Sequence, residues 1–246
     1  MKSFKRKPNM KKIDKRFADK IGTEYALFQL ASPHYMECQK LVASITAQHT
    51  NDTPRILEIG CGTGLTTLEL IKAIPGAKIT AFDAEEAMLA QAKKVLPKSV
   101  ELVWADVQFC LNNMDQTGSS HRQSYDAIVS AFCLHNIAAK YRDTIYYHLG
   151  RFLKSGGIFV TADKIAEEDP MKHWHAFRDQ IEAFSVFQGT DYPELQAEWT
   201  VHYLEDEVIK LTERELRHQL RDRIGCKEVQ FHQRWGMDAV FSGVKQ

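Results

Sequence analysis

No two cysteines in this sequence are spaced as C-x-x-C, and it contains no run of eighteen apolar residues. The first absence argues against a disulfide framework and a zinc site, since both need cysteines at characteristic spacings. The second argues against a membrane-spanning helix. The N-terminal residues also lack the apolar middle of a secretory signal, so we expect a protein of the reducing cytoplasm with no membrane partner. The five cysteines are scattered and odd in number: Cys38, Cys61, Cys110, Cys133 and Cys226.

Patterns that would hold a metal ion are equally scarce. His173 and His175 alternate around Trp174, but no further cluster of ligands stands at a matching spacing. Metal sites in proteins need three or four such ligands. We therefore predict that the protein holds no metal.

Neither sign of charge predominates, because 32 Lys and Arg balance 32 Asp and Glu. The distribution is uneven, however: residues 1–20 hold nine basic residues and two acidic ones. A basic arm of this kind can bind the phosphates of a nucleic acid. It can equally be a solvated, frayed terminus. RNA is therefore an alternative partner.

From residue 54 onward the sequence alternates between strand-like and helix-like segments. Short runs rich in branched apolar residues predict strands at 55–59, 78–82, 100–104, 126–132 and 156–162. Helical spacing predicts helices at 65–73, 85–95 and 139–153. Such alternation favours an α/β, doubly wound and mostly parallel sheet. Two last strands, at 227–232 and 237–244, predict an antiparallel C-terminal hairpin and bring the sheet to seven strands.

Two regions fall outside this alternation. Residues 1–50 precede the first strand and include a helix predicted at 35–47, so we expect a basic arm followed by lid helices. Residues 51–246 would form the main domain. Within it, residues 163–224 are mostly charged and helix-like. We predict a helical insert there that covers the substrate site.

Three glycines separate the first strand from the first helix, in the stretch EIGCGTG at residues 58–64. Glycine permits positive φ and carries no Cβ, so a ligand can lie against the main chain. This turn is at the switch point of a doubly wound sheet, where ligands bind outside the strand ends. A lone glycine pattern is a weak signal. Its weight comes from the flanking strand and helix and from an acid at the end of the next strand.

Acidic residues near the strand ends indicate the kind of ligand. Asp83 can accept both hydroxyls of a ribose, and Asp106 can accept the amino group of an adenine, although either can instead cap a helix. Met88 would pack on the adenine or fill the core stripe of its helix. Glu58 would repel a pyrophosphate, which a dinucleotide loop must bind. An adenosyl compound with an amino group and a sulfonium therefore fits better than NAD.

Taken as an ordered set, EIGCGTG, FDAEEAM, WADV and DAIVSAFCLHNI resemble the motifs of class I S-adenosylmethionine-dependent methyltransferases, over residues 54–162. The resemblance implies a Rossmann-like sheet and S-adenosylmethionine as cofactor. It implies that residues 58–64 surround the methionine part, that 105–106 contact the adenine and that 130–132 lie near the sulfonium. The cofactor-binding residues expected are Glu58, Gly60, Cys61, Gly62, Gly64, Asp83, Ala84, Met88, Ala105, Asp106, Val107, Ser130, Ala131, Phe132 and Tyr25.

One candidate catalytic residue and several lid residues complete the predicted site. His135 follows the fourth predicted strand and can act as a general base, because an imidazole titrates near neutrality. A lining or structural role is the alternative. Tyr25, Phe28, His34 and Tyr35 would close over the cofactor, or pack as an ordinary N-terminal helix.

The predicted activity is in-line transfer of a methyl group from S-adenosylmethionine to an O, N or S atom of a small-molecule acceptor. FADKIGTEY, SPHY and the insert resemble, more weakly, the carboxy-S-adenosylmethionine synthases of tRNA wobble-uridine modification. Those enzymes hold the extra carboxylate with an arginine, whereas residues 190–207 contain none, so this activity is not carried over. The alternatives are an RNA-directed methyltransferase or a carboxy-S-adenosylmethionine-type enzyme of wobble-uridine modification, a non-catalytic cofactor-binding module and an NAD-dependent oxidoreductase. A homodimer is a further expectation.

Overall fold

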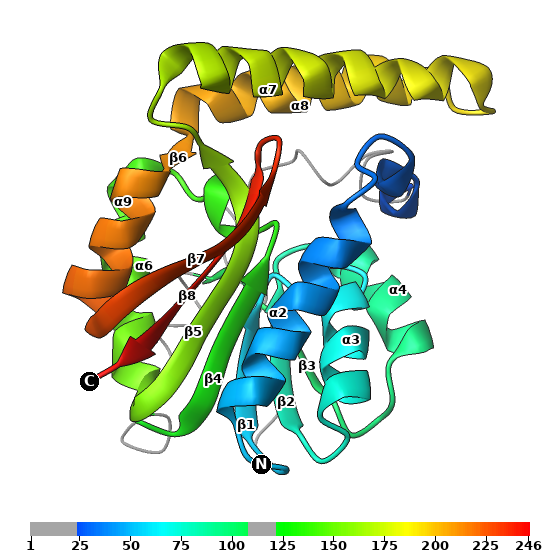
Figure 1. The fold of residues 1–246 in the computed structure, drawn as a ribbon. Coiled ribbons are helices and arrows are strands. Elements are labelled where there is room, and N and C mark those ends of the chain that lie inside the picture. The colour runs from blue at the N-terminus through cyan, green and yellow to red at the C-terminus, as the bar shows by residue number, and fades with distance from the viewer. Residues whose placement is uncertain (1–23, 108–121) are drawn as a thin grey trace.

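The computed structural model describes residues 24–107 and 122–246 and is organised around a twisted sheet (Figure 1). Seven strands follow the order β3-β2-β1-β4-β5-β8-β7. Strands β1 to β5 pair in parallel, whereas β8 is antiparallel to both β5 and β7. The predicted doubly wound sheet with an antiparallel C-terminal hairpin is thus confirmed. The strands are β1 Arg55–Ile59, β2 Lys78–Asp83, β3 Glu101–Trp104, β4 Tyr125–Ala131, β5 Leu153–Ala166, β7 Cys226–Trp235 and β8 Asp238–Lys245.

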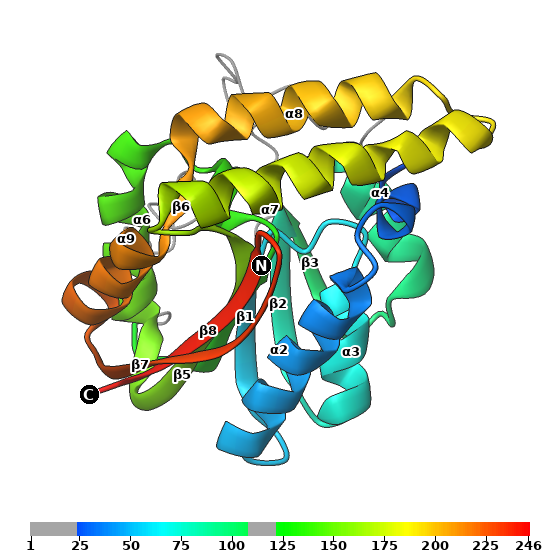
Figure 2. The same ribbon diagram turned by 45° about the horizontal axis from the view of Figure 1, so that its top comes forward.

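Helices cover both faces of this sheet. Figure 1 shows α2, α3 and α4 on one face and α6 and α9 on the other. Figure 2 shows α7 and α8 running together across one end of the sheet. The helical elements are η2 Tyr25–Leu30, α2 Tyr35–His49, α3 Leu65–Ala73, α4 Glu86–Val95, η3 Leu134–Asn136, α6 Ala139–Phe152, α7 Pro170–Ala183, η4 Phe184–Gly189, α8 Leu195–Ile209, α9 Glu213–His218 and the π-helical turn η5 Gln219–Ile224.

The apolar core has one layer on each face of the sheet. Successive residues of a strand point to opposite faces, so a strand buried on both sides is apolar without interruption. In β1, Ile56 packs with residues of α2 and α3, whereas Leu57 packs with residues of α6, and both are fully buried. This arrangement explains why the first predicted strand lacks a polar alternation.

The segment predicted as a helical insert, residues 163–224, has three parts. Strand β5 continues to Ala166, beyond its predicted end. Helices α7 and α8, joined by η4, then form the projecting pair, and Asp169 caps α7 by accepting hydrogen bonds from the next turn at 2.8 and 3.1 Å. The chain returns through β6 (Leu211–Thr212), a short strand not predicted from the sequence that pairs with β5. Element η5 then packs beside α6 and β7, and α9 contacts both through Glu215 and Arg217. Within residues 163–224, the cover over the sheet end is therefore formed by α7, η4 and α8.

Two predicted features lie outside the described residues: the basic arm at 1–20 and Cys110. Within residues 24–107 and 122–246, no helix has the length and apolar character that crossing a membrane requires.

Candidate functional site

The turn between β1 and α3 has left-handed backbone at its glycines. Gly60 has φ +69° and Gly62 has φ +53°, a region that residues with a Cβ rarely adopt. A Cβ on Gly60 would lie 2.3 Å from Cys133 Sγ, so close packing by itself excludes a side chain there. A Cβ on Gly62 would lie 3.2 Å from the terminal methyl of Met88, a flexible side chain. The two glycines thus have different roles. Gly60 allows Cys133 to pack against the turn, whereas the main chain of Gly62 lies beside the flexible Met88 side chain.

Asp83 lies directly against this turn. Its Oδ2 accepts a hydrogen bond from the backbone N–H of Gly62 at 2.8 Å, and its Oδ1 accepts one from Glu85 at 2.9 Å. Burial raises the pKa of Asp83 above its ordinary value, although these two N–H donors partly oppose the rise. The backbone N–H of Ala105 donates to the Asp83 carbonyl at 3.0 Å, which brings the end of β3 alongside. The carboxylate is therefore fixed in place with lone pairs left for a ligand.

Glu58, in β1, is a buried acid with one oxygen unengaged. Its Oε2 accepts a hydrogen bond from Thr67 Oγ1 at 2.6 Å. Its Oε1 has no hydrogen-bond partner among residues 24–107 and 122–246, although the side chain is 1% exposed. Burial raises the pKa of Glu58 to about 7, with the Thr67 hydrogen bond opposing and Asp83 adding to the rise. A buried, unpaired carboxylate oxygen is costly, so this position favours a cationic hydrogen-bond donor as ligand.

The strand β4 contributes the neighbouring wall of the site. Ser130 Oγ donates a hydrogen bond to the Ile59 carbonyl at 3.1 Å, which ties the ends of β4 and β1 together. Ala131 ends the strand, and Phe132 then adopts φ +55°, a left-handed conformation that is unusual for a bulky residue. The Phe132 ring lies 4.8 Å from the ring of Tyr35, between centroids. The strained turn thus directs an aromatic ring toward the N-terminal helices.

Aromatic side chains from three regions gather at this end of the sheet. Tyr25 lies 5.8 Å and Phe28 4.6 Å from Trp199 on α8, between ring centroids. Met88 belongs to the same buried cluster. His34, predicted as a lid residue, instead stacks on Trp235 of β7 at 5.3 Å. The N-terminal helices and α8 therefore close together over the site, and His34 lies outside that contact.

The other predicted cofactor residues are placed as follows. Cys61 is buried in the turn, and its backbone N–H donates to the Phe82 carbonyl at 3.1 Å. The Ala84 carbonyl accepts a hydrogen bond from Trp104 Nε1 at 2.8 Å. A Cβ on Gly64 would lie 2.9 Å from Leu96, so this glycine also meets a packing need. Asp106 and Val107 follow Ala105 and are half-buried.

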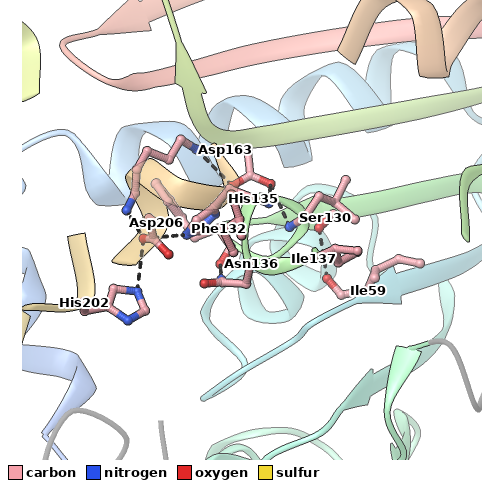
Figure 3. Close-up of polar contacts among 12 residues, drawn as sticks. Ile59, Ser130, Phe132, His135, Asn136, Ile137, Asp163, His202 and Asp206 are labelled. Carbon is pink, nitrogen blue, oxygen red and sulfur yellow. Dashed lines mark hydrogen bonds and ion pairs between the residues drawn. The ribbon is translucent and has the colours of Figure 1, made fainter. Parts of the chain in front are cut away.

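His135 lies under α8, with a carboxylate close to each ring nitrogen (Figure 3). Its Nδ1 is hydrogen-bonded to Asp163, and its Nε2 lies 3.7 Å from Asp206 Oδ2. Lys164 donates to the same Asp206 oxygen, and His202 Nε2 is 3.4 Å from it. None of these four residues, Asp163, Lys164, His202 and Asp206, was predicted from the sequence to belong to the site. The spacing of His202 and Asp206, four residues apart on one helix face, was the available signal.

Residues 57–159 match a protein family described as "Methyltransferase domain". A carboxy-S-adenosyl-L-methionine synthase of Campylobacter fetus is 25% identical over 217 residues, which is 87% of this chain and 86% of that protein. A malonyl-[acyl-carrier protein] O-methyltransferase of a Paenibacillus species is 36% identical over 111 residues, 44% of this chain and 37% of that protein.

A solved structure shares the fold over nearly the whole length. It is the plantazolicin methyltransferase BpumL in complex with a monoazolic desmethylPZN analog and SAH. The TM-score is 0.63 at 15% identity, and the match covers 94% of this chain and 93% of that one. At this identity the likeness establishes the fold alone.

Proposed function

We propose that this chain, whose residues 57–159 match a methyltransferase domain, is a class I S-adenosylmethionine-dependent methyltransferase that methylates an O, N or S atom of a small-molecule acceptor bound under α7 and α8. The observation that carries the proposal is the combination at the glycine turn. A fixed carboxylate, Asp83, lies against the half-buried main chain of Gly62, and a buried carboxylate with an unengaged oxygen, Glu58, lies on the neighbouring strand β1. An adenosyl cation with hydroxyl and ammonium donors satisfies both acids.

The residues present fit this cofactor. Asp83 has lone pairs for the ribose hydroxyls, and Glu58 Oε1 would accept the ammonium of the methionine part. Gly62 would lie against the ligand, with Met88 yielding or packing on the adenine. When bound, S-adenosylmethionine supplies a methyl group that is activated by its positively charged sulfur.

We expect the chain to accelerate transfer mainly by holding two ligands in line and by excluding water. The aromatic cover formed by Tyr25, Phe132 and Trp199 would serve the second purpose. An acceptor with apolar or aromatic surface suits such a wall. We assign no proton transfer to His135, because both of its ring nitrogens lie against buried carboxylates.

A second candidate is the synthesis of carboxy-S-adenosylmethionine, which the similarity to the Campylobacter protein over 87% of this chain favours. Such a cofactor carries an added carboxylate and needs a cation beside it. Helix α8, which covers the site, contains neither Arg nor Lys. Its aromatic residue Trp199 is instead buried in the apolar cover. We therefore prefer the methyltransferase.

Isothermal calorimetry with S-adenosylmethionine, carboxy-S-adenosylmethionine and NAD tests this choice. We expect S-adenosylmethionine to bind more tightly than either of the other two. Mass spectrometry of small molecules extracted from the purified protein would then identify the natural ligand. Tighter binding of NAD would contradict the cofactor assignment, and tighter binding of the carboxylated compound would favour the second candidate.

The acidity of Glu58 gives a pH dependence that can be checked in the same experiment. An ammonium ligand needs the ionised carboxylate, and the pKa of Glu58 is raised to about 7 by burial. Between about pH 8 and about pH 6 the ionised fraction falls by close to tenfold, so affinity for S-adenosylmethionine should fall by about tenfold. Glu58→Gln should bind weakly with little pH dependence in this range. An equally steep pH profile in the variant would contradict the role of Glu58.

The stability of the cofactor-free protein should depend on pH in the opposite direction, and fall as the pH rises. The folded-state pKa of Glu58 is raised from 4.5 to about 7, so the folded state retains the proton longer than the unfolded chain. Its contribution is present below pH 4.5 and is lost as pH rises through 7. At about pH 8 the ionised group therefore costs on the order of 3 kcal/mol of unfolding free energy. Chemical denaturation at that pH should find Glu58→Gln more stable than the natural protein.

A further inference from the structure

Buried ionisable side chains cluster where α8 packs against η3 and β5 (Figure 3). His135, His202 and Asp206 are 5%, 4% and 3% exposed. One nitrogen or oxygen atom from each lies within 4.8 Å of the other two. We propose that these three side chains form a binding site for a divalent transition-metal ion, of the class that includes Zn²⁺, Co²⁺ and Fe²⁺. Two imidazoles and one carboxylate are a ligand set that such ions prefer.

The distances within the cluster are those of a ligand set. His202 Nε2 lies 3.4 Å and His135 Nε2 lies 3.7 Å from Asp206 Oδ2. Good hydrogen bonds between such atoms are shorter, up to about 3.2 Å. Neighbouring ligands around a tetrahedral ion with bonds of about 2.1 Å stand roughly 3.4 Å apart. An ion could therefore be bound with small shifts of the side chains.

Asp163 gives His135 the orientation that a metal ligand needs. One oxygen of Asp163 is bonded to Nδ1 of His135, and the other accepts the backbone N–H of Leu134 at 2.8 Å. The other ring nitrogen of His135, Nε2, lies 3.7 Å from Asp206 Oδ2. An ion between these two atoms would have a nitrogen ligand on one side and an oxygen ligand on the other. A carboxylate behind the ring N–H is also the usual outer support of a metal-binding histidine.

The interior around the cluster is rich in acidic side chains. Asp163, Asp206 and Asp238 are all buried there, and so is Lys164. Lys164 donates to Asp206 and lies 3.3 Å from the centroid of the Tyr203 ring. Buried carboxylates in proteins are normally paired with a cation or coordinate a metal ion. A divalent ion bound at the cluster would add positive charge among these carboxylates.

The proposed ion would join the covering helix to the body of the protein. Two ligands come from α8 and the third from η3, which follows β4. An ion with three protein ligands keeps a position open for water or for a substrate oxygen. Use of that position by the methyl acceptor rests on the proposed function, whereas binding of the ion does not.

The experiment titrates Co²⁺ into the full chain after dialysis against a chelator. Visible absorption reports tetrahedral cobalt, elemental analysis after gel filtration gives the stoichiometry, and the melting temperature gives an independent readout. We expect one ion per chain, tetrahedral absorption bands and a raised melting temperature. Zn²⁺ should displace the cobalt. His202→Gln, whose amide can still donate to Asp206, should weaken binding by about 100-fold or more.

His175→Gln is the matched control, because His175 is exposed on the neighbouring helix α7. It should bind Co²⁺ as the natural protein does. S-adenosylmethionine affinity is measured in the same samples, so that failure of the ion site and failure of the cofactor site are distinguished. Folded protein that takes up no cobalt, or equal uptake by His202→Gln, would overturn the proposal. Lys164 would then be the cation that pairs with Asp206.

Discussion

Replacing Asp83 by Ala should lower the affinity for S-adenosylmethionine by about 100- to 1,000-fold. The proposed contacts are two hydrogen bonds from ribose hydroxyls to an ionised carboxylate, and bonds to a charged group contribute about 1.5–3 kcal/mol each. The loss should appear in the dissociation constant measured by calorimetry. Asp83 also accepts two backbone hydrogen bonds at the glycine turn. Asp83→Asn, which keeps the size of the side chain, separates loss of charge from loss of shape.

Asp126 provides the matched control for this variant. It is also an acid on a parallel strand that accepts a backbone N–H, from Arg55 at 2.8 Å, and it pairs with Lys154 at 2.6 Å. It lies near the start of β4, whereas Asp83 ends β2, so these acids are at opposite ends of the parallel strands. Asp126→Ala should keep the natural affinity. Normal binding by folded Asp83→Ala, or an equal loss in both variants, would refute the ribose assignment.

Replacing Arg142 by Met should lower the free energy of unfolding by about 3–5 kcal/mol, the usual cost of breaking a buried ionic network. Arg142 is 1% exposed and donates to the carbonyls of Ile137 at 2.8 Å and Lys210 at 3.2 Å. It also donates to the Ile209 carbonyl and pairs with Glu215 at 2.8 Å. These bonds join the C-terminal end of α8 to the chain after η3. In a chain of this size the melting temperature should fall by roughly 10 °C.

Arg214 is the exposed counterpart. Its side chain is 84% exposed and pairs with Glu168 at 3.4 Å, so Arg214→Met should change stability by less than about 1 kcal/mol. Chemical denaturation of both variants measures the difference. If Arg142→Met is as stable as Arg214→Met, the buried network does not hold the cover in place.

The sequence was sufficient for the sheet because parallel strands buried on both faces are uninterrupted apolar runs. Ile56 and Leu57 show this in β1. The sequence also located the glycine turn and Asp83. The turn is one short stretch of chain, and Asp83 ends the strand that pairs with β1. What the sequence did not reveal depends on contacts between distant residues. Cys133 packs against Gly60, and Asp163 is hydrogen-bonded to His135. Both contacts arise only when the strands of the sheet are paired.

The packing of residues 163–224 was also not predictable from the sequence. A helical insert that covers the substrate site was expected over residues 163–224, yet α9 and η5 pack beside α6 and β7. Amphipathic spacing predicts that a helix has an apolar face but not which surface that face contacts. The positive φ of Phe132 was likewise unpredictable, because a bulky residue adopts it only when surrounding contacts require it.

A crystal structure of the chain with S-adenosylmethionine most directly tests whether the turn after β1 is the cofactor site. The account predicts ribose oxygens at the Asp83 carboxylate, the ammonium at Glu58 Oε1 and the ligand against the main chain of Gly62. A cofactor bound at another edge of the sheet, or bound without contact to either acid, would contradict it.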